Sequence, residues 1–230
     1  MTTRQHFDIE LAGLQEKMLE MATCADSMVG MAVESLLSGD LELVQEVVQR
    51  DDTVDQMDLD IEALCLRLIA TQQPVARDLR IIGTALKVIT DIERIGDYAV
   101  DIAKIGRRLV RAHEVYQPLV DLPHITSLSR SMLYDALQAF IHHDLDLVDR
   151  VIRADDAVDA LYHSMRSRLT QVLTEDKPHS LLALNTLFAA KYIERISDHV
   201  VNIAERVCFI ETGELKPISP SAALRDDRTI

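Results

Sequence analysis

Apolar residues recur along this chain at steps of three and four, the spacing that places side chains on one face of an α-helix. The pattern runs through six segments separated by short breaks rich in Gly, Pro or polar residues. It predicts six long helices, over residues 7–37, 41–70, 77–112, 123–142, 144–173 and 178–211. Pro74 and Pro178 mark two of the breaks, because a helix interior loses a hydrogen bond at proline.

The second half of the chain repeats the first. Residues 40–55, DLELVQEVVQRDDTVD, align with residues 144–159, DLDLVDRVIRADDAVD, and IERIGDYAVDIA at 92–103 aligns with IERISDHVVNIA at 193–204 with eight identities in twelve. Each copy holds three of the expected helices, and short loops make neighbouring helices antiparallel. The sequence therefore predicts an all-α fold of two tandem three-helix bundles related by internal duplication.

The repeat also suggests domain boundaries. We expect the first bundle at residues 1–115 and the second at 116–215, joined by a linker near residues 113–121. Residues 216–230 contain Pro217 and Pro220 but no periodic apolar positions. This C-terminal segment is expected to be a flexible tail.

Composition supports the helical prediction and narrows the function. Aromatic residues make up only 4% of the chain, there is no Trp, and Gly and Pro number seven and six, so the usual residues of sheets and turns are scarce. The formal net charge of −14 argues against nucleic acid as a partner, since binding to phosphates needs clustered Lys and Arg. The same charge attracts cations and basic protein surfaces.

Two further features bear on where the chain works. Residues 1–11 lack the apolar run of a signal peptide, and no window approaches eighteen uninterrupted apolar residues, so we expect a soluble cytoplasmic protein without membrane insertion. Three widely separated cysteines, Cys24, Cys65 and Cys208, lie among apolar neighbours. They are interpreted as reduced core residues.

Carboxylates interrupt the apolar seam of the second helix in each copy. Stepping by four and three, the seam of the helix at 41–70 reads Val44, Val48, Asp51, Asp55, Asp58, Glu62, Cys65 and Ile69. The equivalent positions of the acids in the second copy are Asp155, Asp159, Tyr162 and Arg166. Burying an ionised carboxylate without a partner is costly, so such a seam implies protons, basic partners or a bound cation.

The third helix of each copy carries a matching acidic ladder. Glu93, Asp97 and Asp101 are spaced by four and flank the apolar stripe, and their equivalents are Glu194, Asp198 and Asn202. If the second and third helices are neighbours, oxygen ligands converge on one site per bundle. We therefore predict carboxylate-bound divalent or trivalent metal ions, with Fe, Mn, Mg, Zn and Ca all open.

An alternative interpretation needs no metal. An acidic ladder beside an apolar stripe is most often a solvated helix face, and Arg50, Arg94 and Arg195 lie close enough in sequence to pair with the acids. His163 and His199 adjoin the motifs, although a histidine on a helix surface more often faces solvent. There is no E-x-x-H motif of di-iron bundles, no phosphate-binding Gly-rich loop and no C-x-x-C. These absences give no indication of catalysis. If the carboxylates do bind metal, a metal-dependent enzyme or a metal-storage bundle remains as an alternative function.

Three stretches resemble the PhoU family of bacterial phosphate-signalling proteins. They are HFDIELAGLQEKMLEMA at 6–22, QQPVARDLRIIGTALKVITDIERIGDYAVDIAK at 72–104 and KYIERISDHVVNIAERV at 191–207. The resemblance implies tandem three-helix bundles with multinuclear metal clusters on E/D-x-x-x-D motifs. Those motifs match Glu93, Asp97 and Asp101, then Glu194 and Asp198, and the aspartates Asp51, Asp55, Asp155 and Asp159. Asn202 stands in place of an acid, which implies fewer or different ions at the second site.

The resemblance also implies a regulatory function. PhoU proteins are cytoplasmic negative regulators of the phosphate-starvation response, linking the phosphate ABC transporter to its sensor histidine kinase. The expected partners are therefore this kinase and the ATPase subunit of the transporter, and a homodimer is left open. The motifs predict no partner surface, because such surfaces are not short linear signatures.

Overall fold

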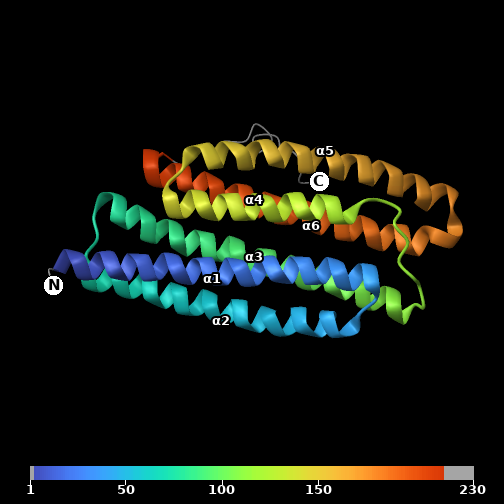
Figure 1. Cartoon of the computed structure of the whole chain (residues 1–230), viewed down its shortest axis with the longest axis horizontal. Coiled ribbons are helices and arrows are strands. Elements are labelled where there is room, and N and C mark those ends of the chain that lie inside the picture. The colour runs from blue at the N-terminus through green and yellow to red at the C-terminus, as the bar shows by residue number, and fades with distance from the viewer. Residues whose placement is uncertain (1–2, 215–230) are drawn as a thin grey trace.

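Six long α-helices account for almost all of the computed structural model, which describes residues 3–214 (Figure 1). The helices are α1 (Thr3–Ser38), α2 (Leu41–Gln72), α3 (Ala76–Arg111), α4 (Leu122–His142), α5 (Leu145–Glu175) and α6 (Ser180–Thr212), with a 3₁₀ turn η1 (Lys177–His179) before α6. All six predicted helices are confirmed, with ends that differ by a few residues. The predicted tail at 216–230 lies outside the described residues.

The repeated Asp at the head of the second helix explains why α2 and α5 begin where they do. Asp40 Oδ1 accepts hydrogen bonds from the backbone N–H groups of Glu42 and Leu43, at 2.8 and 3.4 Å. In the second copy Asp144 Oδ1 accepts the equivalent bonds, at 2.9 and 3.3 Å. A carboxylate at this position satisfies N–H groups that the first helical turn leaves unpaired.

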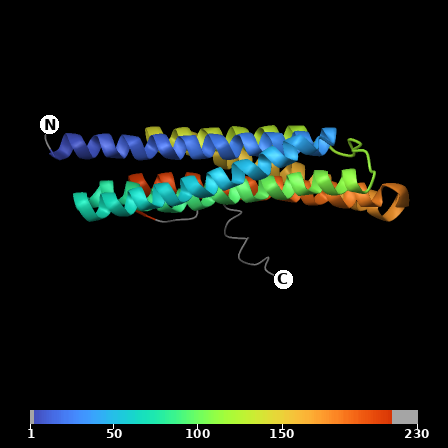
Figure 2. The ribbon, with the colours of Figure 1, turned by 90° about the horizontal axis from the view of Figure 1, so that it is seen from below.

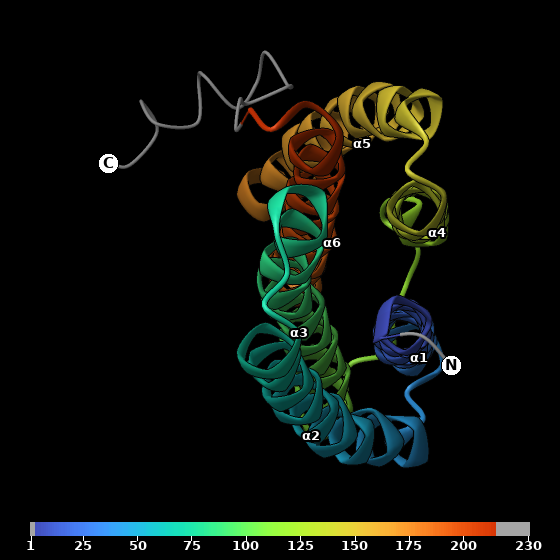
Figure 3. The same cartoon turned by 90° about the vertical axis from the view of Figure 1, so that its left-hand side faces the viewer.

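The helices form two layers. Viewed end on, α2, α3, α6 and α5 form a curved row in that order, and α1 and α4 lie side by side on its inner face (Figure 3). The view from below shows α1 and α4 above α3 and α6 (Figure 2). The predicted all-α architecture of two three-helix bundles is confirmed, with α3 and α6 at the junction between them.

One large hydrophobic cluster runs through both bundles, and a smaller one of Leu169, Val172 and Ala183 lies between α5 and α6. The large cluster includes Met28 and Ile92 of the first bundle and Phe140 and Ile193 of the second, each at most 1% exposed. Because apolar area removed from water stabilises a fold roughly in proportion to its extent, this continuous core ties the two repeats into one folded unit.

The core of α2 differs from its predicted seam. Its buried residues are Val44, Val47, Val54, Ile61, Cys65 and Leu68. Asp55, Glu62 and Val48 are exposed, so placing them at core positions was wrong. From Val44 the buried seam steps by three and then four, so Val47, Val54 and Ile61 lie one residue before the predicted positions. The helix keeps its seven-residue repeat, and its core face lies on the other side of the line that Val44 and Cys65 mark. Asp51 and Asp58 remain partly buried beside it.

The junction between the bundles has an approximate two-fold symmetry. The α3 and α6 helices run antiparallel, and the ring of Tyr98 stacks on that of Tyr192 with a centroid distance of 5.7 Å. In the repeat, Tyr98 corresponds to His199 and Tyr192 corresponds to Asp91. The symmetry-equivalent contact is therefore polar, with 2.8 Å between His199 Nδ1 and Asp91 Oδ1.

In the layer formed by α1 and α4, a bidentate ion pair joins the two helices. Arg130 of α4 donates through Nε and Nη2 to the two carboxylate oxygens of Asp26 on α1, at 2.8 and 2.6 Å. A Cβ on Gly30 would lie 3.1 Å from Arg130 Nη1, so the glycine leaves room for the guanidinium. Bidentate geometry of this kind fixes orientation as well as adding energy.

Within residues 3–214, no helix combines the length and apolar character that crossing a bilayer requires. All three cysteines are free thiols. Cys65 is buried in the core, and burial raises the pKa of its thiol to about 12. Its thiol therefore stays protonated and packs as a small apolar group, as predicted.

The close crossing of α1 and α3 gives a stability prediction. A Cβ on Gly106 would lie 3.1 Å from Leu36 Cα and 3.3 Å from the Ser35 carbonyl oxygen, all backbone atoms of α1. We expect Gly106→Ala to lower the free energy of unfolding by about 1–3 kcal/mol, because the helices must move apart. Urea unfolding followed by circular dichroism measures this.

Gly83 provides the matched control, since it lies on the same helix and its Cβ would meet nothing within 4 Å. Gly83→Ala should leave stability unchanged or raise it by up to about 1 kcal/mol, because alanine is the better helix former. Equal effects of the two substitutions would contradict the close-packing argument.

Candidate metal centre

Acidic side chains from α2 and α3 meet on the outer face of the helical row. We call Asp51, Asp55, Asp58, Glu93 and Asp97 the α2–α3 cluster. The two helices come close at Gly96. Asp51 Oδ1 of α2 lies 3.5 Å from the position that a Cβ on Gly96 of α3 would occupy. Gly106 of α3 faces α1. Asp97 lies about two and a half helical turns before Gly106, so it projects from the side of α3 that faces away from α1. The cluster is open to solvent.

Mutual repulsion within the cluster is clearest at Asp51. Burial, followed by the charges of Asp55 on the same helix and Asp97 on α3, raises the pKa of Asp51 from 3.8 to about 6. Lys104 lowers this pKa and Asp52 raises it, both to a smaller extent. The charges of α2 and α3 therefore act on each other across the helix interface.

Glu93 and Asp58 show the same coupling. The pKa of Glu93 is raised by burial and by Asp97, and further by Asp55 and Asp58, against the lowering effect of Arg94. The pKa of Asp58 is raised by burial, then by Glu62 and Asp55. Asp58 Oδ1 is buried and accepts no hydrogen bond from the described residues. Such an oxygen gains from any cation or proton that reaches it.

Two basic side chains compensate part of this charge. Arg94 Nη1 donates to Asp97 Oδ2 at 2.7 Å and lies 3.5 Å from Glu93 through Nε. Lys104 donates to Asp101 at 3.1 Å. Arg94 is about half exposed, and exposed ion pairs of this kind contribute little. They leave the buried side of the cluster, at Asp51 and Asp58, uncompensated.

The equivalent acids of the second bundle have a different environment. Asp155 is 1% exposed, and Asp159, Glu194 and Asp198 are partly buried between α5 and α6. Arg195 donates to Asp198 at 3.4 Å. We call these four acids the α5–α6 cluster. They occupy the same positions in the repeat as Asp51, Asp55, Glu93 and Asp97.

Lys191 and Tyr162 account for the difference between the two clusters. Lys191 Nζ donates to Glu194 and stands 5.1 Å from the centre of the Tyr162 ring. Tyr162 and Arg166 replace the carboxylates that α2 carries as Asp58 and Glu62. The α5–α6 cluster thus contains more of its own positive charge, and fewer acids, than the α2–α3 cluster.

Three predicted or adjacent residues lie apart from these clusters. Asn202 Nδ2 donates to Asp91 of α3 at 3.1 Å, so its amide faces the other bundle rather than α5. His199 contacts the same Asp91. His163 is exposed and binds the carbonyl oxygen of Asp159 through Nδ1 at 2.7 Å. Neither histidine joins an acidic cluster.

The residues fit a hard cation in chemistry, although their side chains do not converge on one point. Within residues 3–214, no three Asp, Glu, His or Cys side chains are gathered closely enough to hold an ion as they stand. The donor atoms are carboxylate oxygens, one of them buried without a hydrogen bond at Asp58. Asp51 and Asp97 are near enough for their charges to interact across the interface of α2 and α3.

Some residues of these sites were not apparent from the pattern. Lys191 occupies the position of Thr90 in the repeat, and this substitution, together with Arg166 in place of Glu62, is the sequence signal of compensating charge in the second copy. The contact of Asp91 with His199 and Asn202 left no signal, because the residues are more than a hundred positions apart.

Taken together, the fold and the site define a class: an all-α protein of two repeated three-helix bundles with carboxylates on its outer face. A family model described as PhoU domain matches residues 18–106 and 122–207, one match in each bundle. The chain belongs to the PhoU family.

Individual relatives match over nearly their whole length. A protein of Clostridium acetobutylicum named phosphate-specific transport system accessory protein PhoU homolog is 36% identical, over 92% of this chain and 97% of its own. The crystal structure of PhoU from Pseudomonas aeruginosa matches with a TM-score of 0.84 and 35% identity, covering 90% of this chain and all of that one. A phosphate transport system regulatory protein PhoU from Streptococcus pneumoniae matches with a TM-score of 0.83 and 28% identity, over 91% and 99%.

The raised pKa of Asp51 predicts how stability depends on pH without metal. The pKa of Asp51 is about 6 in the folded protein, compared with an ordinary value of 3.8 that applies to the unfolded chain. Proton binding to Asp51 therefore favours the folded state. This stability is complete below pH 4 and is lost as pH rises through 6. In chelator-treated protein, Asp51→Asn should raise the free energy of unfolding at pH 7.5 by about 1 kcal/mol, after allowing for solvent screening, and have little effect near pH 4.

Asp52 supplies the control, being the exposed neighbour on the same helix. Asp52→Asn should change stability by less than about 0.5 kcal/mol at either pH. Urea unfolding at both pH values measures the difference, and a destabilising Asp51→Asn at pH 7.5 would contradict the repulsion argument.

Proposed function

We propose that this chain is a cytoplasmic, metal-binding adaptor that negatively regulates the phosphate-starvation response and phosphate uptake. In this proposal it links the ATPase subunit of a phosphate ABC transporter to a sensor histidine kinase when phosphate is plentiful. The observation that carries the proposal is the repeated carboxylate motif, which two bundles of the PhoU type hold on one outer face.

The regulatory part of the proposal is supported by the names of the relatives. Proteins that match more than 90% of this chain are named accessory proteins of a phosphate-specific transport system. Such names describe regulators rather than enzymes, which favours an adaptor over a metal-dependent enzyme. The transporter is the partner to which the names point, and the kinase and a homodimer are extensions of the proposal.

The metal part of the proposal rests on electrostatics. Asp51, Asp58, Glu93 and Asp97 would supply oxygen ligands from α2 and α3. A bound ion would offset the burial and the repulsion that raise the pKa values of Asp51, Asp58 and Glu93. With the repulsion offset, α2 and α3 would be held together more firmly. The α5–α6 cluster is proposed as the weaker site, because Lys191 and Arg195 already pair with its acids.

The adaptor part of the proposal follows from rigidity and charge. Both clusters lie on a row of four long helices stiffened by one continuous core. A net charge of −14 favours encounter with basic protein surfaces. Metal occupancy would change the charge of this face, and with it the partners that the face accepts.

Removing metal should destabilise the protein. If ions bind the folded state alone, a free concentration a hundred times the Kd stabilises it by about 2.7 kcal/mol. We therefore expect chelator to lower the thermal midpoint, and an added ion among Fe, Mn, Mg, Zn and Ca to restore it. An unchanged midpoint, together with no metal by elemental analysis of the purified protein, contradicts metal binding.

Matched variants in the two bundles locate the metal. Glu93→Gln with Asp97→Asn should abolish most of the metal-dependent rise in the midpoint. Glu194→Gln with Asp198→Asn, at the equivalent positions of the second repeat, should reduce it less. A larger loss from the second pair would reverse the assignment of the stronger site.

Loss of the protein should release the phosphate-starvation response. Deleting the gene is expected to raise expression from a phosphate-starvation reporter in phosphate-rich medium, because the negative regulator is gone. Restoring the wild-type gene should return repression. A reporter that stays repressed after deletion contradicts the signalling role.

Complementation with variant genes tests whether repression of the reporter depends on the α2–α3 cluster. A gene carrying Asp51→Asn and Asp97→Asn should restore repression poorly, while Asp52→Asn should restore it fully at equal protein levels. Full repression by the double variant would separate regulation from the α2–α3 cluster.

A further inference from the structure

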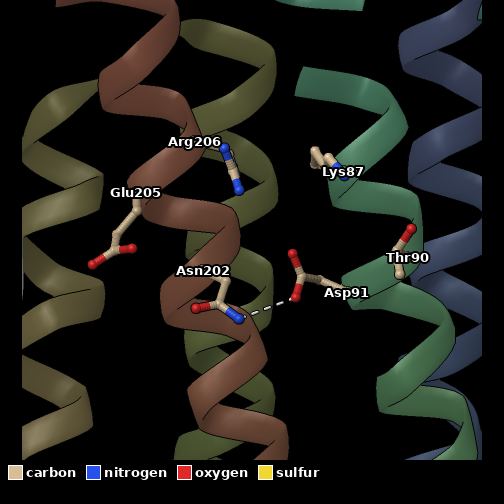
Figure 4. Close-up of a pocket in the computed structure, with 6 residues that line it drawn as sticks. All are labelled: Lys87, Thr90, Asp91, Asn202, Glu205 and Arg206. Atoms are coloured by element: carbon tan, nitrogen blue, oxygen red, sulfur yellow. Dashed lines mark hydrogen bonds between the residues drawn. The ribbon is translucent and has the colours of Figure 1, made fainter. Parts of the chain in front are cut away.

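We propose that a pocket at the junction of the two bundles binds inorganic phosphate through Lys87 and Arg206 and recognises the proton on that anion through Asp91. The pocket lies between α3 and α6 and has a volume of about 300 Å³. Its lining is polar: Lys87, Thr90, Asp91, Asn202, Glu205 and Arg206 (Figure 4). This volume is at the lower end for ligand sites, which suits a small anion.

Two cations face one another across this pocket. Lys87 belongs to α3 and Arg206 to α6, and their charged ends lie on the same side of Asp91 (Figure 4). Within the part of the chain that the structure describes, neither forms an ion pair or hydrogen bond through its side chain. The pocket thus offers two cationic side chains whose donors are not engaged by a carboxylate, although Asp91 and Glu205 also line it. A tetrahedral oxyanion can accept hydrogen bonds from both at once.

The negative side chains of the pocket are arranged so that an anion can still enter. Asp91 Oδ1 is occupied by His199 Nδ1 at 2.8 Å and by Asn202 Nδ2 at 3.1 Å. These contacts disperse its charge and fix the orientation of the carboxylate. The carboxylate of Glu205 points away from Asp91 and Lys87 (Figure 4).

Asp91 gives the site its chemical selectivity. Its second oxygen, Oδ2, points toward the side of the pocket where Lys87 and Arg206 lie (Figure 4). A carboxylate oxygen accepts hydrogen bonds but cannot donate them. Phosphate keeps at least one proton near neutral pH, so its hydroxyl can donate a hydrogen bond to this oxygen. Sulfate has no proton at that pH, and its oxygens are repelled by the Asp91 carboxylate. A polar contact that the wrong ligand leaves unpaired is a strong source of specificity.

An anion held in this way would bridge the bundles. It would join Lys87 of the first repeat to Arg206 of the second, beside the contact between Asp91 and His199. A ligand that contacts both sides of a junction favours the arrangement in which both contacts are made. The site is separate from the carboxylate clusters, and the inference does not depend on metal binding.

Isothermal titration calorimetry of the full chain with inorganic phosphate at pH 7 tests the site. We expect one phosphate per chain, with sulfate at least about tenfold weaker. Lys87→Met and Arg206→Met should each weaken phosphate binding by at least about tenfold, because each removes a charge-assisted contact. Asp91→Asn should bring the phosphate and sulfate affinities close together.

Arg108→Met is the control, since it removes one exposed positive charge from α3 outside the pocket. Its phosphate affinity should stay within about twofold of the wild type. If phosphate still binds after both Lys87→Met and Arg206→Met, the proposal is overturned. Phosphate coordinated by a metal at the carboxylate clusters would give that result. The lack of any heat at millimolar phosphate, or a nucleoside monophosphate that binds more tightly than the free anion, also overturns the proposal.

Discussion

The antiparallel packing of α3 on α6 is the interaction on which the rest of the structure depends. Each is the third helix of its repeat, and each is buried on one side by the first helix of its own bundle. Their contact merges two small cores into one hydrophobic cluster. Since burial of apolar surface is the main stabilising term, the two repeats fold as a continuous body whose outer face keeps its shape.

This packing explains why like charges are tolerated on the outer face. Burial and then the repulsion from Asp55 and Asp97 raise the pKa of Asp51 to about 6, and this cost is small beside the burial of α2 and α3 against the core. Proteins often place destabilising charge where function needs it and offset the cost elsewhere. The face therefore carries several carboxylates without loss of the fold.

Divergence between the repeats has given the two halves different chemistry on one scaffold. Lys191 stands where the first repeat has Thr90, and Tyr162 stands where it has Asp58, which shifts the α5–α6 cluster toward neutrality. At the junction, His199 and Asp91 replace the pair of tyrosines that the symmetry would otherwise repeat. The fold survives these changes because Tyr162 is accommodated within the core and His199 and Asp91 satisfy each other at the junction.

The sequence by itself determined the helices, the duplication and the ladders of acids, because these depend on residues close together in the chain. The period of apolar positions located six helices, and Asp40 and Asp144 marked where α2 and α5 begin. Tertiary structure decided the rest. Asp55 and Glu62 lie outside the core because α1 and α3 pack on the side of α2 that carries Val54 and Ile61, one residue earlier in each case. Asn202 turned toward Asp91, since only the packing of α3 on α6 brings residues so distant in sequence within reach of a hydrogen bond.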